Sequence, residues 1–78
     1  MSTFSITNAA SLGAALRQTR KALGITQESL SLKTGISRPS IRSIEYGKET
    51  SQLGLALQLC QDLGVRLEAR PPEGIEPK

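Results

Sequence analysis

The sequence predicts an all-α domain of four to five helices, followed by one short β-strand. Three observations support this fold class. Apolar residues recur at helical spacing in four segments, and capping residues or glycines bound those segments. Only 3% of the residues are aromatic, and one stretch alone alternates apolar and charged residues as a strand does. The 78 residues suit one domain near the lower size limit for a self-sufficient core.

The chain is expected to begin with an arm and a first helix. Residues 1–7 lack a helical pattern and form the arm. Thr7 or Asn8 can cap the helix that follows, and Gly24 ends it. The helical domain should therefore occupy residues 8–64. The stripe of its first helix that faces the core consists of Leu12, Leu16, Thr19 and Leu23.

Residues 25–48, ITQESLSLKTGISRPSIRSIEYGK, predict two short helices joined by a tight turn. Thr26 is a suitable N-cap for the first of them, and Gly35 can take the left-handed conformation at its end. Only Ile36 separates this stop from Ser37, which is a second N-cap. Two caps so close together force the helices to cross steeply, which is the helix-turn-helix geometry.

The second of these helices, expected over residues 38–46, has one apolar side and one polar side. Ile41 and Ile44 share the side that must face the core. The opposite side carries Pro39, Arg42, Ser43 and Tyr46, with Arg38 near the tip. Small polar residues and arginines near the start of a helix suit the major groove of DNA. An ordinary solvated helix would show the same pattern, so this pattern alone leaves both interpretations open.

Arg20 and Glu45 flank the apolar stripes of their two helices. We expect them to form an ion pair at the edge of the core. Desolvation offsets much of the attraction in such a pair, but the loss of one partner leaves a poorly solvated charge.

Ser51 is expected to cap a fourth helix over residues 52–63, which Gly64 ends. More of its positions are apolar than the single stripe of a monomeric surface helix needs. Five of them suit the core, namely Leu53, Ala56, Leu57, Cys60 and Leu63. The remaining two, Leu55 and Leu59, would be exposed and would indicate a partner surface, with a loosely packed surface as the alternative.

Residues 65–70, VRLEAR, alternate strictly and predict a strand with one apolar side. The apolar positions are Val65, Leu67 and Ala69. A single strand cannot satisfy its own backbone, so we expect antiparallel pairing with the same strand of a second subunit. A ladder with residues 4–6 of the arm is the competing interpretation. Residues 71–78, which begin with two prolines, are expected to form a disordered tail.

The charge is concentrated where a DNA-binding surface would need it. The net charge is +3. Residues 1–50 hold seven basic and three acidic side chains, whereas residues 51–78 hold three and four. The positive excess therefore lies in the part that contains the helix-turn-helix, as an electrostatic footprint on phosphates requires.

Composition also argues against several other classes. A single cysteine and no histidine leave no disulfide, no usual zinc site and no histidine-based triad. Ser37, Ser40 and Ser43 lack a base, so we expect no enzyme activity and no cofactor. No apolar run could span a membrane and no signal peptide precedes the domain, so we expect no membrane contact and a cytoplasmic protein.

These residues closely resemble the Cro/repressor-like (XRE) helix-turn-helix family, which implies a lambda-repressor-like fold. The resemblance covers about residues 12–65. It rests on ITQESLSLKTGIS followed by RPSIRSIEYGK, on Arg20 ahead of them, and on the LGV that ends the last helix. The leucine-rich fourth helix followed at once by VRLEAR further resembles the HipB-type antitoxins. Those are dimeric repressors whose C-terminal strands pair between subunits, and they bind a HipA-like serine/threonine kinase toxin.

The resemblance implies which residues touch DNA. Those facing bases or the groove would be Ser37, Arg38, Pro39, Arg42 and Ser43, and those touching the backbone would be Thr26, Gln27 and Lys48. Pro39 stands where the family often has a hydrogen-bonding residue, so readout there would reduce to methyl or shape contact. Ser31 stands where the family favours alanine between packed helices.

The function that the resemblance implies is sequence-specific repression by a homodimer on an inverted-repeat operator. The dimer surface would include Leu55, Leu59, Val65, Leu67 and Ala69. The narrower expectation is the antitoxin of a HipBA-like pair, which represses its own operon and binds the kinase toxin. A solitary or phage-type XRE regulator, or a module that chiefly neutralises a partner protein, are the alternatives.

Overall fold

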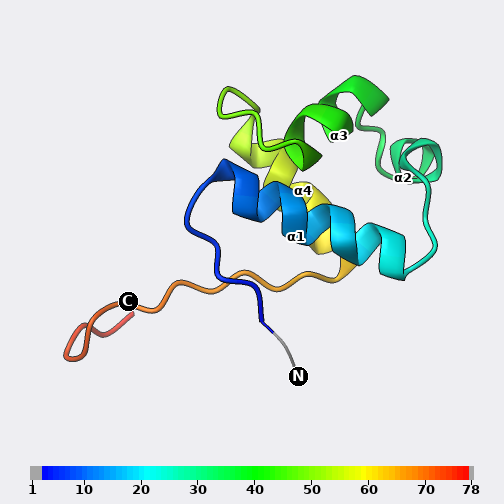
Figure 1. Cartoon of the computed structure of the whole chain (residues 1–78). Coiled ribbons are helices and arrows are strands. Elements are labelled where there is room, and N and C mark those ends of the chain that lie inside the picture. The colour runs from blue at the N-terminus through cyan, green and yellow to red at the C-terminus, as the bar shows by residue number, and fades with distance from the viewer. Residues whose placement is uncertain (1–2, 78) are drawn as a thin grey trace.

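A computed structural model describes residues 3–77, and in this range the chain forms four α-helices and no strand (Figure 1). They are α1 (Ala9–Ala22), α2 (Gln27–Thr34), α3 (Arg38–Glu45) and α4 (Leu53–Leu63). The helix α3 packs on both α1 and α2, and α4 packs on α1. The predicted all-α helix-turn-helix fold is confirmed, with four helices. None of the helices in this range is long and apolar enough to cross a membrane.

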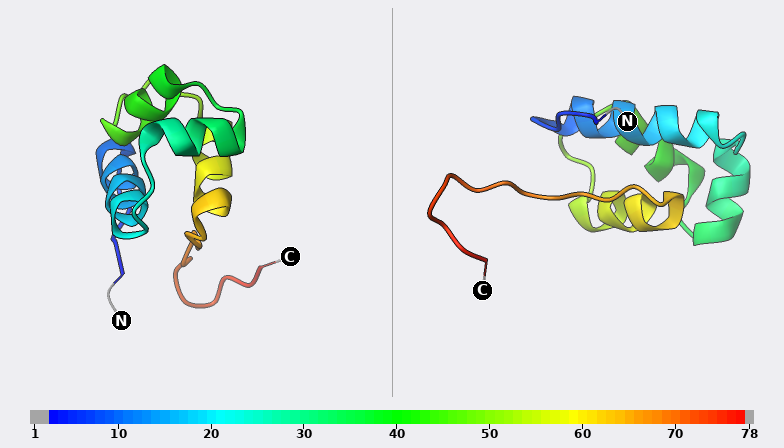
Figure 2. Two further views of the ribbon diagram at one scale, coloured as in Figure 1. Left: turned by 90° about the vertical axis from the view of Figure 1, so that its right-hand side faces the viewer. Right: turned by 90° about the horizontal axis from the view of Figure 1, so that it is seen from below.

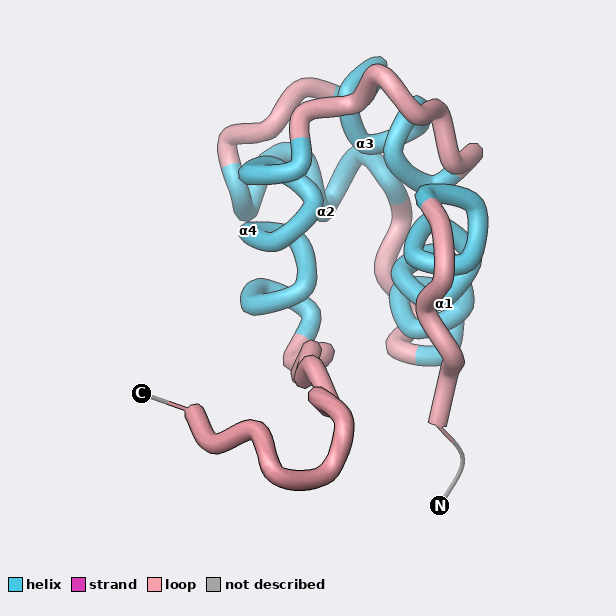
Figure 3. Tube along the Cα trace, turned by 90° about the vertical axis from the view of Figure 1, so that its left-hand side faces the viewer, coloured by secondary structure: helices cyan, strands magenta, loops and turns pink. Residues whose placement is uncertain are grey.

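The helices α1 and α4 run side by side, and α3 lies over one long side of them. Figure 2 shows α1 and α4 on opposite sides of the domain, with α3 above them. Figure 3 shows the segment after α4 leaving from the side opposite α3, whereas the N-terminal arm joins α1 close to the end of α3 and runs down beside the helices. One side of the domain therefore presents α3, and the segment after α4 leaves from the opposite side.

Local capping explains where the first three helices begin. The side chain of Asn8 accepts a hydrogen bond from the N–H of Ser11 (2.8 Å), and the Ser11 hydroxyl accepts from the N–H of Asn8 (3.1 Å). Thr26 and Ser37 accept from backbone N–H groups in the same way, at 3.0 Å and 3.3 Å. The caps predicted for the helix-turn-helix are confirmed, and Asn8 rather than Thr7 caps α1.

The fourth helix begins differently from its prediction. Gln52, not Ser51, is the N-cap of α4, and its side chain makes no capping hydrogen bond. The Ser51 hydroxyl is buried instead and has no hydrogen-bond partner among the described residues. Its backbone N–H donates to the carbonyl of Lys48 (3.0 Å), so Ser51 belongs to the turn before the helix.

The core is aliphatic and lies where the four helices meet. Its fully buried large side chains are Leu16, Leu30, Ile41 and Leu59. The side chains that complete the cluster around them are Leu12, Ile36, Ile44, Ala56, Cys60 and Leu63. Leu23, predicted to lie on the core stripe of α1, is exposed because it is the C-cap, where the chain leaves the helix.

The predicted orientation of the α4 leucines is wrong. Leu59 is completely buried (0% exposed) and Leu55 is half-buried against the core. Leu53 and Leu57, which were assigned to the core, are instead 64% and 44% exposed. The buried face of α4 is the stripe Ala56, Leu59, Cys60 and Leu63, at spacings of three and four residues. When apolar residues surround most of a helix, its sequence cannot decide which face meets the core.

Residues 65–70 form no ladder within the single chain. Val65 is half-buried, and its N–H donates to the carbonyl of Cys60 (2.7 Å) at the end of α4. The residues after it are exposed, and no backbone hydrogen bond joins them to residues 4–6. The alternative of an intramolecular ladder is therefore wrong. Pairing between subunits stays a prediction, because residues 65–70 could form strand hydrogen bonds only with a second chain.

Candidate nucleic-acid interface

The helix α3 presents a polar, basic face on one side of the domain. The helix is anchored by Ile41 and Ile44, which are buried in the core as predicted. Arg38, Pro39 and Arg42 are exposed, and Ser43 is half-buried. Tyr46, the C-cap of the helix, is 81% exposed. A short helix fixed by two isoleucines therefore offers its N-terminal end and one side to a partner.

The turn before α3 fixes the angle between the two helices of the motif. Gly35 has a φ of +78°, which a residue with a side chain rarely adopts. Ile36 is buried, and its N–H donates to the hydroxyl of Thr34 (3.1 Å). Because Ile36 anchors the turn in the core, α3 cannot swing independently of α2.

The ion pair predicted between Arg20 and Glu45 is confirmed. Arg20 Nε donates to Glu45 Oε2 (2.7 Å), and the terminal guanidinium nitrogen Nη2 donates to Oε1 (3.0 Å). Arg20 Nη1 also donates to the carbonyl of Ile25 (2.8 Å) in the turn before α2. Both charged residues are buried. One arginine thus ties α1 to α3 and to the start of α2.

Gln27 belongs to the same network. Its side-chain Nε2 donates to Glu45 Oε1 (3.1 Å), so the amide predicted to touch the DNA backbone also holds the first turn of α2 against α3. The Thr26 hydroxyl is likewise engaged as the cap of α2. The first amides of a helix lack backbone partners within that helix; in α2 the Ser29 N–H donates to Thr26, and the amides before it are suited to a phosphate.

A close approach of α1 to α3 supports this arrangement. A Cβ atom at Gly13 would collide with the carbonyl oxygens of Ile44 and Glu45. The sequence offered no reason to single out Gly13, which occurs in an otherwise ordinary helical turn. Only a residue without a side chain lets α1 contact the backbone of α3 directly.

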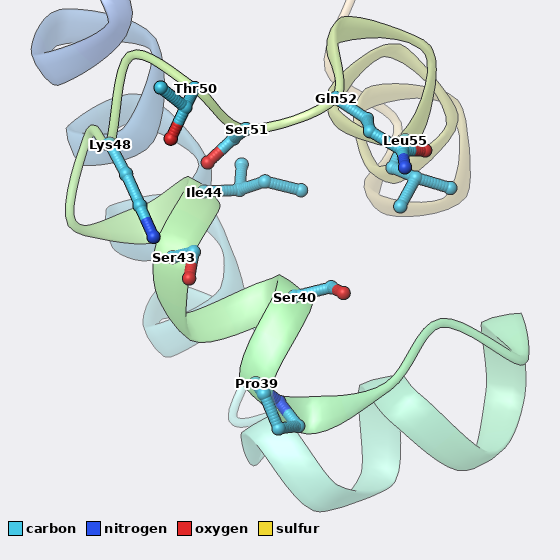
Figure 4. A pocket seen from close by; sticks show the side chains of 9 residues that line it. All are labelled: Pro39, Ser40, Ser43, Ile44, Lys48, Thr50, Ser51, Gln52 and Leu55. Atoms are coloured by element: carbon cyan, nitrogen blue, oxygen red, sulfur yellow. The ribbon is translucent and has the colours of Figure 1, made fainter.

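Two hollows lie beside α3. The first, of about 250 Å³, lies between α3, the loop after it and the start of α4 (Figure 4). Figure 4 shows the side chain of Lys48 extending toward Ser43 on α3. The hydroxyls of Ser40, Thr50 and Ser51 are also part of the lining. This hollow thus combines three of the predicted DNA contacts, Pro39, Ser43 and Lys48, with further hydrogen-bonding groups.

The second hollow, also of about 250 Å³, lies between α1, the start of α2 and the last turn of α3. Its lining consists of Arg17, Arg20, Gln27, Arg42, Glu45 and Tyr46. Arg17 was not among the predicted contacts. The helical wheel of α1 shows that this arginine is exposed, but it does not show that the arginine lies near α3. The pair Arg20–Glu45 is the one ion pair among residues 3–77, so Arg17 and Arg42 have no carboxylate partner there.

The predicted dimer residues do not form one exposed surface. Leu59 lies in the core, and Leu55 and Val65 pack against it. Leu67 and Ala69 are exposed in the segment after α4. The exposed apolar residues of α4 itself are Leu53 and Leu57.

Comparison with known proteins finds relatives across most of the chain. A model of the helix-turn-helix family HTH_3 matches residues 16–69. An uncharacterized HTH-type transcriptional regulator of Sinorhizobium fredii is 35% identical over 63 residues, which are 81% of this chain and 83% of that protein. One of Methanocaldococcus jannaschii is 40% identical over 53 residues, which are 68% of this chain and 80% of that protein.

Two solved structures share the fold. The HipB–O4 20mer complex superimposes with a TM-score of 0.78 at 23% identity, covering 88% of this chain and 97% of that one. A complex of a HipB variant with the O2 20mer gives a TM-score of 0.82 at 24% identity, covering 92% and 100%. At these identities the likeness concerns the arrangement of the helices.

Proposed function

Because this chain belongs to the HTH_3 helix-turn-helix family and is a DNA-binding transcriptional regulator, we propose that it is a sequence-specific repressor that acts as a homodimer. The observation that carries the proposal is the exposed basic face of α3. It is held by two buried isoleucines and flanked by two hollows, one lined in part by Lys48 and the other in part by Arg17 and Arg42.

In the proposed complex the N-terminal end of α3 enters the major groove. Ser37, Arg38 and Pro39 face base edges there, and Ser43 faces the groove. The Arg38 guanidinium is exposed and can donate two hydrogen bonds to one guanine, which is the commonest specific contact of an arginine. Lys48 and the first turn of α2, with Thr26 and Gln27, contact the phosphates beside the groove.

Two subunits related by a twofold axis would place their α3 helices in successive major grooves, about 34 Å apart. The target is then an inverted repeat. Occupancy of such a site in a promoter excludes polymerase, which is sufficient for repression. The second subunit is proposed to contact Leu53 and Leu57 on α4 and to pair its residues 65–70 with the same segment.

Selection from a random pool of duplexes tests the proposal directly. We expect one inverted repeat to emerge, and Arg38→Ala to relax the preference at one base pair in each half-site. The control is Lys21→Ala, which removes an equal charge from an exposed position of α1 that lines neither hollow. Equal affinity of the unaltered protein for selected and scrambled duplexes would reject sequence-specific repression.

The narrower proposal is that the chain is the antitoxin of a HipBA-like pair and binds a serine/threonine kinase toxin. It is supported by the fold shared with HipB and by the leucine-rich α4 followed at once by residues 65–70. The test is co-purification with the product of the adjacent gene. The double variant Arg38→Ala with Arg42→Ala should lose DNA while it still binds the kinase. A neighbouring gene that encodes no kinase would favour a solitary regulator.

A further inference from the structure

We propose that Arg17 and Arg42 together bind one phosphate of the DNA backbone, so that Arg42 positions the protein on the duplex and does not read a base. The inference rests on DNA binding as proposed above. It adds Arg17 to the interface and gives Arg42 a different role from the groove contact expected of it.

The lining of the second hollow shows which charges remain available. Of its three arginines, Arg20 is buried and already donates to Glu45 and to the carbonyl of Ile25. The carboxylate of Glu45 also accepts from Gln27, so its charge and its hydrogen-bonding capacity are engaged within the protein. Arg17 and Arg42 are exposed and have no ion-pair partner in residues 3–77.

Two unpaired guanidinium groups that line one hollow repel each other, and a bound anion offsets that repulsion. With Arg20 and Glu45 neutralising each other, the hollow carries a net charge of +2 from Arg17 and Arg42. A phosphodiester bears one negative charge and two free oxygens, which match the planar donor pattern of guanidinium groups. Tyr46 lines the same hollow and is 81% exposed, so its hydroxyl can add a donor.

The position of Arg42 in the helix favours a backbone phosphate over a base. Recognition helices contact base edges mainly with their N-terminal residues. Arg42 lies in the last turn of α3, four residues after Arg38 and therefore about 6 Å farther along the helix axis. Arg17 comes from α1, so a ligand that contacts both arginines must lie where α1 and the end of α3 meet. That place suits the wall of the groove better than its floor.

The experiment compares Arg17→Ala, Arg42→Ala and Arg38→Ala on the selected duplex and on a scrambled duplex, between about 50 and 200 mM salt. The substitutions at Arg17 and Arg42 should weaken binding to both duplexes by the same factor and reduce the salt slope by about one per bound subunit. They should leave the base preference unchanged. Arg38→Ala should relax it at one position. Lys21→Ala is the control of equal charge.

A single neutral methylphosphonate in the selected duplex identifies the phosphate. At one position the methylphosphonate should weaken binding by the unaltered protein. On that duplex, Arg17→Ala and Arg42→Ala should cause no further loss of affinity. The proposal is overturned if Arg42→Ala changes the preferred base at one position, or if Arg17→Ala behaves as Lys21→Ala does. If the unaltered protein prefers no sequence, the repressor function fails, whereas the salt slopes on the scrambled duplex still decide the role of the two arginines.

Discussion

Glu45 is the residue on which three hydrogen bonds from two other helices converge. Its carboxylate accepts two from Arg20 and one from Gln27, while the residue itself is 7% exposed. A buried carboxylate is stable only when it is paired and hydrogen-bonded. The same side chain thus anchors the end of α3 to α1 and orients the first turn of α2, which joins the stability of the fold to the geometry of the proposed DNA-binding face.

The variants Arg20→Gln and Glu45→Gln should each lower the free energy of unfolding by about 3 kcal/mol, because each leaves an uncompensated buried charge. Thermal melting of each variant measures this. Replacement of both residues by apolar ones, Arg20→Met with Glu45→Leu, should recover much of the loss. Unchanged melting in both single variants would show that the pair contributes no stability.

Cys60 gives stability a dependence on alkaline pH. Burial among the core side chains raises the pKa of its thiol above the ordinary value of 9.0. The unfolded chain therefore loses this proton at a lower pH than the folded chain does. The contribution of the thiol is complete below 9.0 and is lost as the pH rises from there through the folded pKa. Urea unfolding at about pH 7 and about pH 10 should show a larger loss in the unaltered protein than in Cys60→Ala. Parallel losses would contradict this.

At the scale of the elements, the sequence predicted the starts of helices better than their faces. Caps act locally, so Thr26 and Ser37 could be identified from their neighbours alone. The orientation of α4 depends on what it packs against, and seven apolar positions allowed more than one choice of buried face. The prediction of Ser51 as the cap of α4 was wrong, because Ser51 forms a turn with Lys48 and the helix begins one residue later than expected.

The sequence also predicted the ion pair but missed Gly13 and Arg17. The Arg20–Glu45 pair could be predicted because each residue flanks an apolar stripe, and the helical spacing of the apolar residues fixes which side of the helix is buried. A close helix approach and a shared hollow are properties of two elements at a particular distance. A single helical wheel contains no such information.

Gly13→Ala should lower the free energy of unfolding by about 1–3 kcal/mol, because the added methyl group forces α1 away from the carbonyls of Ile44 and Glu45. Gly54→Ala is the matched control, since nothing lies within 4 Å of a Cβ there. The better helix propensity of alanine should stabilise that variant by about 0.5 kcal/mol. Urea unfolding measures both, and equal stability of the two variants would rule out the close approach.

At the scale of the whole molecule, the side that presents α3 and the side from which the segment after α4 leaves are distinct. The face of α3 lies on one side, and residues 65–70 leave from the other (Figure 3). A second subunit that contacts α4 and this segment would leave both α3 helices free. The small aliphatic core is consistent with such completion by a second chain, since domains of this size often need it.

The dimer itself can be tested by a substitution chosen from the corrected orientation of α4. Leu57→Asn removes an exposed apolar side chain one turn from Leu53 and should leave the fold intact, because neither residue belongs to the core. Sedimentation at micromolar concentration should show dimers for the unaltered protein and single chains for the variant. Leu32→Asn on α2 is the control, since Leu32 is 81% exposed and lies outside the proposed interface. If Leu57→Asn remains dimeric, α4 is not the contact, and residues 65–70 would have to carry the association alone.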